Sequence, residues 1–141
     1  MGPVLVGCDG SAPSGRAFDW AARAADRFEA PLHLVYVVAP VVMPMELTGY
    51  ALGQMVQEHQ AWAETLLGTL REKLPPHVAA RCTTEVRHGS PADQLLAAAH
   101  DKGAELVVVG TTGRGAAGRL LLGSVADRVV HLAPIPVLVA R

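Results

Sequence analysis

Runs of apolar residues alternate along the chain with segments whose apolar positions recur every three or four residues. This alternation is typical of parallel strands joined by crossover helices, and it predicts an α/β fold. Helices are expected at residues 11–28, 52–74, 90–103 and 124–132. Strands are expected at residues 4–8, 32–38, 78–87, 106–109 and 135–140. No linker or repeat interrupts the pattern, so residues 1–141 are predicted to form one domain.

Two of these segments differ from the rest. Residues 78–87 alternate strictly between apolar and polar side chains, which predicts a half-exposed strand at a sheet edge. Residues 39–49 hold two prolines and no strand alternation, so they are predicted to be a loop that could fold over a ligand.

Composition narrows the function classes. Twelve Lys and Arg residues against thirteen Asp and Glu give a net charge of -1, and aromatic residues make up only 4% of the chain, so nucleic-acid binding is not expected. The longest apolar stretch is broken by Pro40 and Pro44, and the N-terminus lacks the pattern of a signal peptide. These features predict a cytoplasmic protein without a membrane segment. Cys8 and Cys82 are then expected to be two separate buried thiols.

The richest local signal is a glycine-rich segment that begins with Gly110-Thr111-Thr112-Gly113 and ends, after nine further residues, with Gly123-Ser124. It starts where a predicted strand stops and ends where a predicted helix starts, which is where open α/β sheets bind ligands. Glycines allow backbone amides to approach a phosphate closely. The candidate hydrogen-bond donors to a phosphate are the Ser124 hydroxyl and the first amides of the predicted helix. These amides belong to Gly123, Ser124, Val125 and Ala126.

Arg114 and Arg119 lie inside this segment, where they could neutralise a polyphosphate. The alternative is a glycine-rich surface turn with two solvated arginines. Two other phosphate motifs do not fit. Residues 113–118 match GxGxxG, but no further strand ending in an acid follows about twenty residues later. A Walker A loop needs a lysine after its last glycine, and neither Lys73 nor Lys102 is near.

Several motifs together resemble the universal stress protein family, and the resemblance covers essentially the whole chain. The matching segments are residues 6–11, 89–91, 107–115, 122–126 and 134–139. The spacing G-x2-G-x9-G-[ST] marks the ATP-binding branch of that family, and this chain keeps all four marked positions.

The resemblance implies an open five-stranded parallel sheet in the order 3-2-1-4-5 with helices on both faces, a Rossmann-like fold of the adenine nucleotide α hydrolase type. It implies ATP as ligand, with Mg²⁺. Asp9 is implied to accept a hydrogen bond from the adenosine, and Val38 to contact the adenine. The other implied contacts are Gly7 and Cys8 to the adenosine, Val109 and Gly110 to the base and ribose, and Thr112, Gly113, Arg114, Gly123, Ser124 and Val125 to the phosphates.

Catalysis is expected to be weak. Phosphoryl transfer needs a group that positions the nucleophile, yet no Asp or Glu lies between Glu105 and Asp127. No catalytic residue and no protein metal site are predicted, and the resemblance implies a nucleotide-dependent switch or sensor in stress response with at most slow hydrolysis. Two alternatives stay open. One is a small ATP hydrolase or nucleotidyl transferase that uses Asp9 and Arg114, and the other is a dimerisation module without nucleotide.

The last predicted strand suggests a partner surface. In the order given above it lies at a sheet edge, and its apolar side chains are Ile135, Val137, Leu138 and Val139. An unpaired apolar edge favours pairing with another chain, and antiparallel pairing with a second copy closes a two-fold dimer. The family resemblance also implies a homodimer of this kind.

Overall fold

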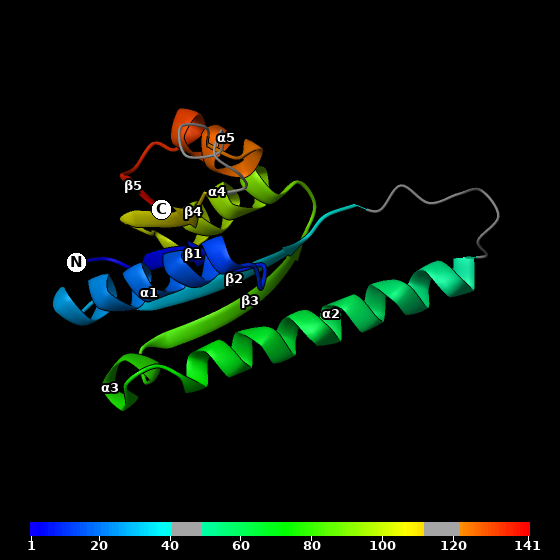
Figure 1. Cartoon of the computed structure of the whole chain (residues 1–141), viewed down its shortest axis with the longest axis horizontal. Coiled ribbons are helices and arrows are strands. Elements are labelled where there is room, and N and C mark those ends of the chain that lie inside the picture. The colour runs from blue at the N-terminus through cyan, green and yellow to red at the C-terminus, as the bar shows by residue number, and fades with distance from the viewer. Residues whose placement is uncertain (41–48, 112–121) are drawn as a thin grey trace.

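The computed structural model describes residues 1–40, 49–111 and 122–141. Its strands form one parallel sheet in the order β3-β2-β1-β4-β5 (Figure 1). The strands are β1 (Val4–Gly7), β2 (Leu32–Val38), β3 (Cys82–His88), β4 (Leu106–Gly110) and β5 (Val137–Ala140). The predicted α/β fold and its strand order are confirmed.

Helices cover both faces of the sheet. They are α1 (Ala12–Arg27), α2 (Gly49–Glu72), α3 (Pro76–Ala79), α4 (Pro91–Lys102) and α5 (Ser124–Leu132). The first three pack on one face and the last two on the other, so that two hydrophobic clusters enclose the sheet (Figure 1). None of the helices in the described part of the chain has the length and apolarity needed to cross a membrane.

The central strand explains why both faces are covered. Val4, Leu5 and Val6 are completely buried, because β1 pairs with strands on both sides and helices cover both faces of the sheet. Successive side chains of a strand point to opposite faces. Val4 and Val6 therefore pack toward α1, and Leu5 packs toward α4. Continuous apolar runs of this kind are typical of strands buried on both sides.

The predicted start of the third strand is wrong. Val78 belongs to the short helix α3, and β3 begins only at Cys82. The Val78 amide donates to the Pro75 carbonyl at 2.9 Å, and Pro76 occupies the first helical position, where its missing N–H is not needed. Val78 is still buried, so its place in the apolar pattern reflects one helical turn and not a strand. The sheet-edge position predicted for the third strand is confirmed.

Other boundaries move by a few residues. β5 starts at Val137, so Ile135 precedes the strand, and β1 ends at Gly7, one residue before Cys8. The second long helix already includes Gly49, which had been assigned to the preceding loop. Most of that predicted loop, residues 41–48, lies outside the described residues. With α3 added, the described chain has one helix more than predicted.

β2 and β3 lie on one side of β1, and β4 and β5 lie on the other side, so the strand order reverses between β1 and β4. At this point the end of β4 and the start of α1 come very close together. A Cβ added to Gly110 would lie 2.3 Å from the Pro13 carbonyl oxygen, which is far inside van der Waals contact. Only glycine allows the backbone of β4 to end directly under the first turn of α1.

Replacing Gly110 with alanine tests this close approach. We expect Gly110→Ala to lower the free energy of unfolding by about 1–3 kcal/mol, because the backbone of α1 must shift to admit the methyl group. Urea unfolding measures this change. Gly68→Ala is the control: Gly68 lies in α2 with no atom within 4 Å of an added Cβ. That change is expected to stabilise the chain by about 0.5–1 kcal/mol. Equal stability of Gly110→Ala and wild type would contradict the close packing.

Candidate functional site

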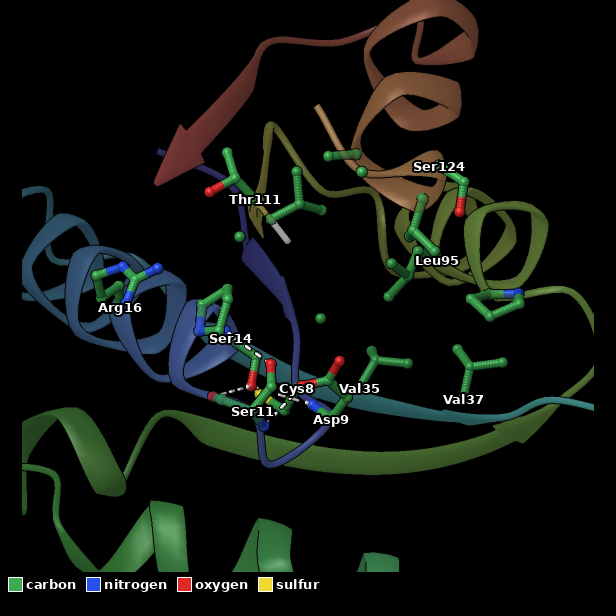
Figure 2. Close-up of a pocket in the computed structure, with 18 of the residues that line it drawn as sticks. Cys8, Asp9, Ser11, Ser14, Arg16, Val35, Val37, Leu95, Thr111 and Ser124 are labelled. Carbon is green, nitrogen blue, oxygen red and sulfur yellow. Dashed lines mark hydrogen bonds between the residues drawn. The ribbon is translucent and has the colours of Figure 1, made fainter. Parts of the chain in front are cut away.

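A cavity of about 860 Å³ opens at the carboxyl ends of β1 and β4, where the strand order reverses. Figure 2 shows its walls, which come from the β1–α1 loop, β2, the start of α4, the end of β4 and the start of α5. Its volume lies within the range of small-molecule sites. A cavity at this reversal is where open α/β sheets bind ligands.

Most of the residues predicted for the site line this cavity. They are Gly7, Cys8, Asp9, Val109, Gly110, Gly123, Ser124, Val125 and Ala126. Their approach from three separate parts of the chain follows from the sheet order, which places β1 beside β4. Thr112, Gly113 and Arg114, together with Arg119, lie outside the described residues.

Val38 occupies a different place from the one expected. Its side chain packs in the hydrophobic cluster on the α2 face of the sheet and lines a second cavity of about 630 Å³. The β2 side chains that line the first cavity are Val35 and Val37. Alternate residues of a strand face opposite sides, so Val38 cannot share their direction. The Val38 side chain therefore does not line the first cavity, and the contact between Val38 and the adenine stays a prediction.

Several residues that line the first cavity are not among those predicted from the sequence. They are Ser11, Ala12, Pro13, Ser14, Arg16, Val35, Val37, Pro91, Leu95 and Thr111. Two signals were available. The period of two along β2 identifies Val35 and Val37 as one face, and the spacing of four from Ala12 to Arg16 places both on one side of α1. Thr111 directly follows β4, so its place at the end of a strand beside the glycine motif was a further signal.

The loop between β1 and α1 is closed by its own hydrogen bonds. The Ser11 amide donates to Asp9 Oδ1 at 2.8 Å, and the Asp9 amide donates to Ser14 Oγ at 3.2 Å. The Ser14 amide donates to Ser11 Oγ at 3.3 Å, so Ser11 is the N-cap of α1, as predicted. Figure 2 shows these bonds below the cavity. The first turn of α1 is thus capped from within the loop.

The Asp9 carboxyl group is held in its charged form. Partial burial by itself raises its pKa, but the hydrogen bonds from Ser11, from Ser14 and from its own amide outweigh this effect. The net result is a pKa below the ordinary aspartate value. At neutral pH, Asp9 therefore presents a carboxylate to the cavity, and this carboxylate can accept a hydrogen bond.

The first turn of α5 has no side-chain cap in the described part of the chain, whereas the first turn of α1 has one. Its N-cap residue is Gly123, which has no side chain to accept a hydrogen bond. Within the described residues, the amides of Ser124, Val125 and Ala126 donate to no acceptor. Free amides at a helix N-terminus carry partial positive charge and form an anion-binding site. These residues line the cavity, so the open start of α5 faces into it.

Cys8 lies in the cavity wall as an inert thiol. It is only 3% exposed, and burial, with a smaller contribution from the Asp9 charge, raises its pKa to about 12. A thiol with this pKa stays protonated at neutral pH and is a poor nucleophile. Cys82 is likewise buried and free, as predicted. Within the described residues, no group of His, Cys, Asp or Glu side chains could hold a metal ion.

The charge on Asp9 predicts a pH-dependent effect on stability. Because the folded-state pKa is lowered, Asp9 stabilises the fold above its ordinary pKa of about 3.9, and this contribution is lost as the pH falls. We expect Asp9→Asn to reduce the free energy of unfolding at pH 7 by up to about 1 kcal/mol, since the loop is partly exposed. Urea unfolding at several pH values measures the difference.

The difference in the free energy of unfolding between Asp9→Asn and wild type should shrink as the pH falls through the unfolded-state pKa of Asp9 and then through its lower folded-state pKa. Asp19→Asn is the control. Asp19 is exposed on α1, the helix that follows the Asp9 loop, and it does not line the cavity. It should show no such pH-dependent loss. An Asp9→Asn difference that stays constant down to acidic pH would show that the charge is not the cause.

Comparison with known proteins supports one family. The family model described as "Universal stress protein family" matches residues 1–141. A universal stress protein of Mycolicibacterium smegmatis is 39% identical over 98% of this chain, but the chain spans only 47% of that longer protein.

Two solved structures have the same fold. The universal stress protein UspA from Lactobacillus plantarum matches with a TM-score of 0.83 at 24% identity, over 99% of this chain and 97% of that one. A universal stress protein in complex with cAMP matches with a TM-score of 0.73 at 29% identity, over 99% and 95% of the two chains. The family model covers the full length of the chain, and the chain belongs to the universal stress protein family.

Proposed function

We propose that this chain binds an adenine nucleotide, ATP with Mg²⁺, in the cavity at the end of β1 and β4, and that it acts as a regulatory switch or sensor in the stress response. The observation that carries the proposal is the open start of α5. Its free amides face a cavity of about 860 Å³ next to Gly110, where an anionic tail can approach the backbone.

The chemistry of the walls supports this ligand class. Val35, Val37 and Leu95 supply apolar surface for a flat base, and Asp9 supplies an acceptor for a base amino group or a ribose hydroxyl. The amides at the start of α5 supply donors for phosphate oxygens. The proposal retains Thr112, Gly113 and Arg114 as further phosphate contacts on the basis of the sequence motif.

The comparisons support the same class of ligand. The structurally similar universal stress protein with 29% identity was solved in complex with cAMP, an adenine nucleotide. The present chain spans about half of the M. smegmatis relative, so the activity of that longer protein is not transferred to it. The proposal concerns nucleotide binding by the unit described here.

The residues present fit Mg²⁺ that enters with the nucleotide. Mg²⁺ usually keeps several waters and binds substrate phosphates with one or two carboxylates. Asp9 is the acid among the described residues that line the cavity. It already accepts a hydrogen bond from the Ser11 amide, so phosphate oxygens and water would supply most of the metal ligands.

The geometry favours binding over turnover. A general base works best when its pKa lies near the working pH, and the pKa of Asp9 is lowered by its hydrogen bonds. Asp9 is therefore a weak base for activating water. We propose that ATP hydrolysis is slow at most, and that the signal comes from the bound nucleotide itself.

The proposal also includes assembly and location. β5 lies at the edge of the sheet and pairs only with β4 among the described strands. The apolar side chains along this edge are partly exposed: Ile135, Val137, Leu138 and Val139. Antiparallel pairing of β5 with a second copy would complete the sheet as a two-fold homodimer. The buried free thiols of Cys8 and Cys82 fit a reducing compartment, the cytoplasm.

A negative charge at the start of α5 tests nucleotide binding. We expect Ser124→Glu to weaken ATP binding at least about tenfold, because the carboxylate repels the phosphates and competes for the free amides. The same change should keep or raise stability by about 0.3–1 kcal/mol, since an acid favours a helix N-terminus. Calorimetric titration with ATP and Mg²⁺ measures the first effect, and urea unfolding measures the second.

Gln57→Glu introduces the same charge on the exposed surface of α2, away from the cavity, and should leave ATP binding unchanged. Nucleotide released from freshly purified, denatured protein gives an independent check by mass analysis. If wild type binds no adenine nucleotide in either experiment, the proposed function is wrong.

A further inference from the structure

One cation in the cavity wall is not explained by the family motif. Arg16 lies in the second turn of α1, and among the described residues that line the cavity it is the only one with a positive charge. Figure 2 shows it beside the Thr111 end of the cavity, whereas Val37 lies at the opposite end. Figure 2 also shows Leu95 and Ser124 on the Val37 side, so the apolar side chains and the start of α5 lie across the cavity from Arg16.

The Arg16 guanidinium makes no ion pair with any described residue. Several other arginines of the described chain are engaged, although two buried guanidinium nitrogens of Arg81 also lack a partner within it. Arg87 bonds to Glu85 at 2.8 Å and Asp101 at 2.7 Å, and Arg128 bonds to Asp93 at 3.0 Å. Arg23, on the same helix as Arg16, lies over the Trp20 ring at 5.3 Å. Arg16 thus offers its donors to a ligand without breaking an existing pair.

The position of Arg16 is fixed by the packing around it. The next two residues, Ala17 and Phe18, are buried and hold this turn of α1 against the sheet. One turn earlier, the Pro13 backbone rests on Gly110. The backbone of Arg16 is therefore held at the rim of the cavity, and its exposed side chain can adjust to an anion there.

The charges in the cavity give the ligand a direction. The ionised carboxylate of Asp9 accepts hydrogen bonds from the neutral sugar or base end of the ligand, and the cationic groups attract its phosphates. The free amides of α5 attract the phosphates nearest the sugar, and a longer chain has the Arg16 end of the cavity left to reach. In a cyclic nucleoside monophosphate the single phosphate is closed into a ring with the sugar, so it cannot extend from α5 toward Arg16.

We propose that Arg16 binds the distal phosphates of the ligand and makes this site prefer nucleoside polyphosphates over cyclic or simple monophosphates. This inference rests on the proposed nucleotide-binding function and goes beyond it by naming the residue that selects nucleoside polyphosphates. Arg16 acts as a binding residue for the terminal phosphates, and it takes no part in a chemical step.

Three ligands and four proteins test the inference by calorimetric titration in the presence of Mg²⁺. The ligands are ATP, AMP and cAMP, and the proteins are wild type, Arg16→Ala, Arg16→Lys and Arg23→Ala. We expect Arg16→Ala to weaken ATP binding about threefold to tenfold, as for loss of one charge-assisted contact at a partly exposed site. The affinity for cAMP should change less than about twofold. The loss for ATP should decrease as salt is added.

Arg16→Lys keeps the charge and should recover at least part of the ATP affinity. Arg23→Ala removes a cation from the same helix outside the cavity and should leave all three affinities unchanged. Thermal unfolding of each variant checks that the fold is intact.

The outcomes separate the two proposals. If wild type binds adenine nucleotides and Arg16→Ala weakens all three ligands equally or none of them, the inference about Arg16 is wrong and the nucleotide site stands. If wild type binds none of the three ligands, both proposals fail.

Discussion

The contact between the end of β4 and the start of α1 determines where everything else in the cavity lies. Gly110 has no side chain, so the Pro13 carbonyl can rest directly on the backbone of β4. This contact brings the Asp9 loop, the end of β4 and the residues that lead to α5 to one end of the sheet. A larger residue at position 110 would separate α1 from β4, and the cavity would lose its floor.

Among the helices that begin at this cavity, α1 and α5 have first turns of opposite kinds. The first turn of α1 is capped by its own loop, where the Ser11, Ser14 and Gly15 amides have acceptors, and the Asp9 carboxylate faces the cavity. The first turn of α5 begins with Gly123 and is left open. The result is a cavity with an acceptor on one side and donors on the other, which orients a ligand that has a neutral polar end and an anionic end.

The sequence predicts the strands well because their apolar runs are buried on both faces, as in Val4–Gly7. The glycine spacing likewise locates the start of α5. The error at Val78 has a local cause: apolar and polar residues that alternate over a few positions also fit one helical turn, and Val78 lies in such a turn. A pattern along the chain also does not say which side of the sheet a ligand occupies, and the Val38 side chain packs on the α2 face. The contribution of Arg16 depends on α1 lying over β4, which becomes visible only in three dimensions.

The described parts of the cavity are held in place before any ligand arrives. The exposed pair between Arg128 and Asp93 contributes little to this, because exposed ion pairs are weak. The packing is what matters: Ala126 and Val129 of α5 share a buried cluster with Leu95 of α4. The open amides of α5 are thus fixed relative to α4, and binding need not order them. A ligand can shift a switch only by its difference in affinity for two states. In a cavity whose described walls are already formed, that difference depends on the phosphate groups and on the charges that meet them.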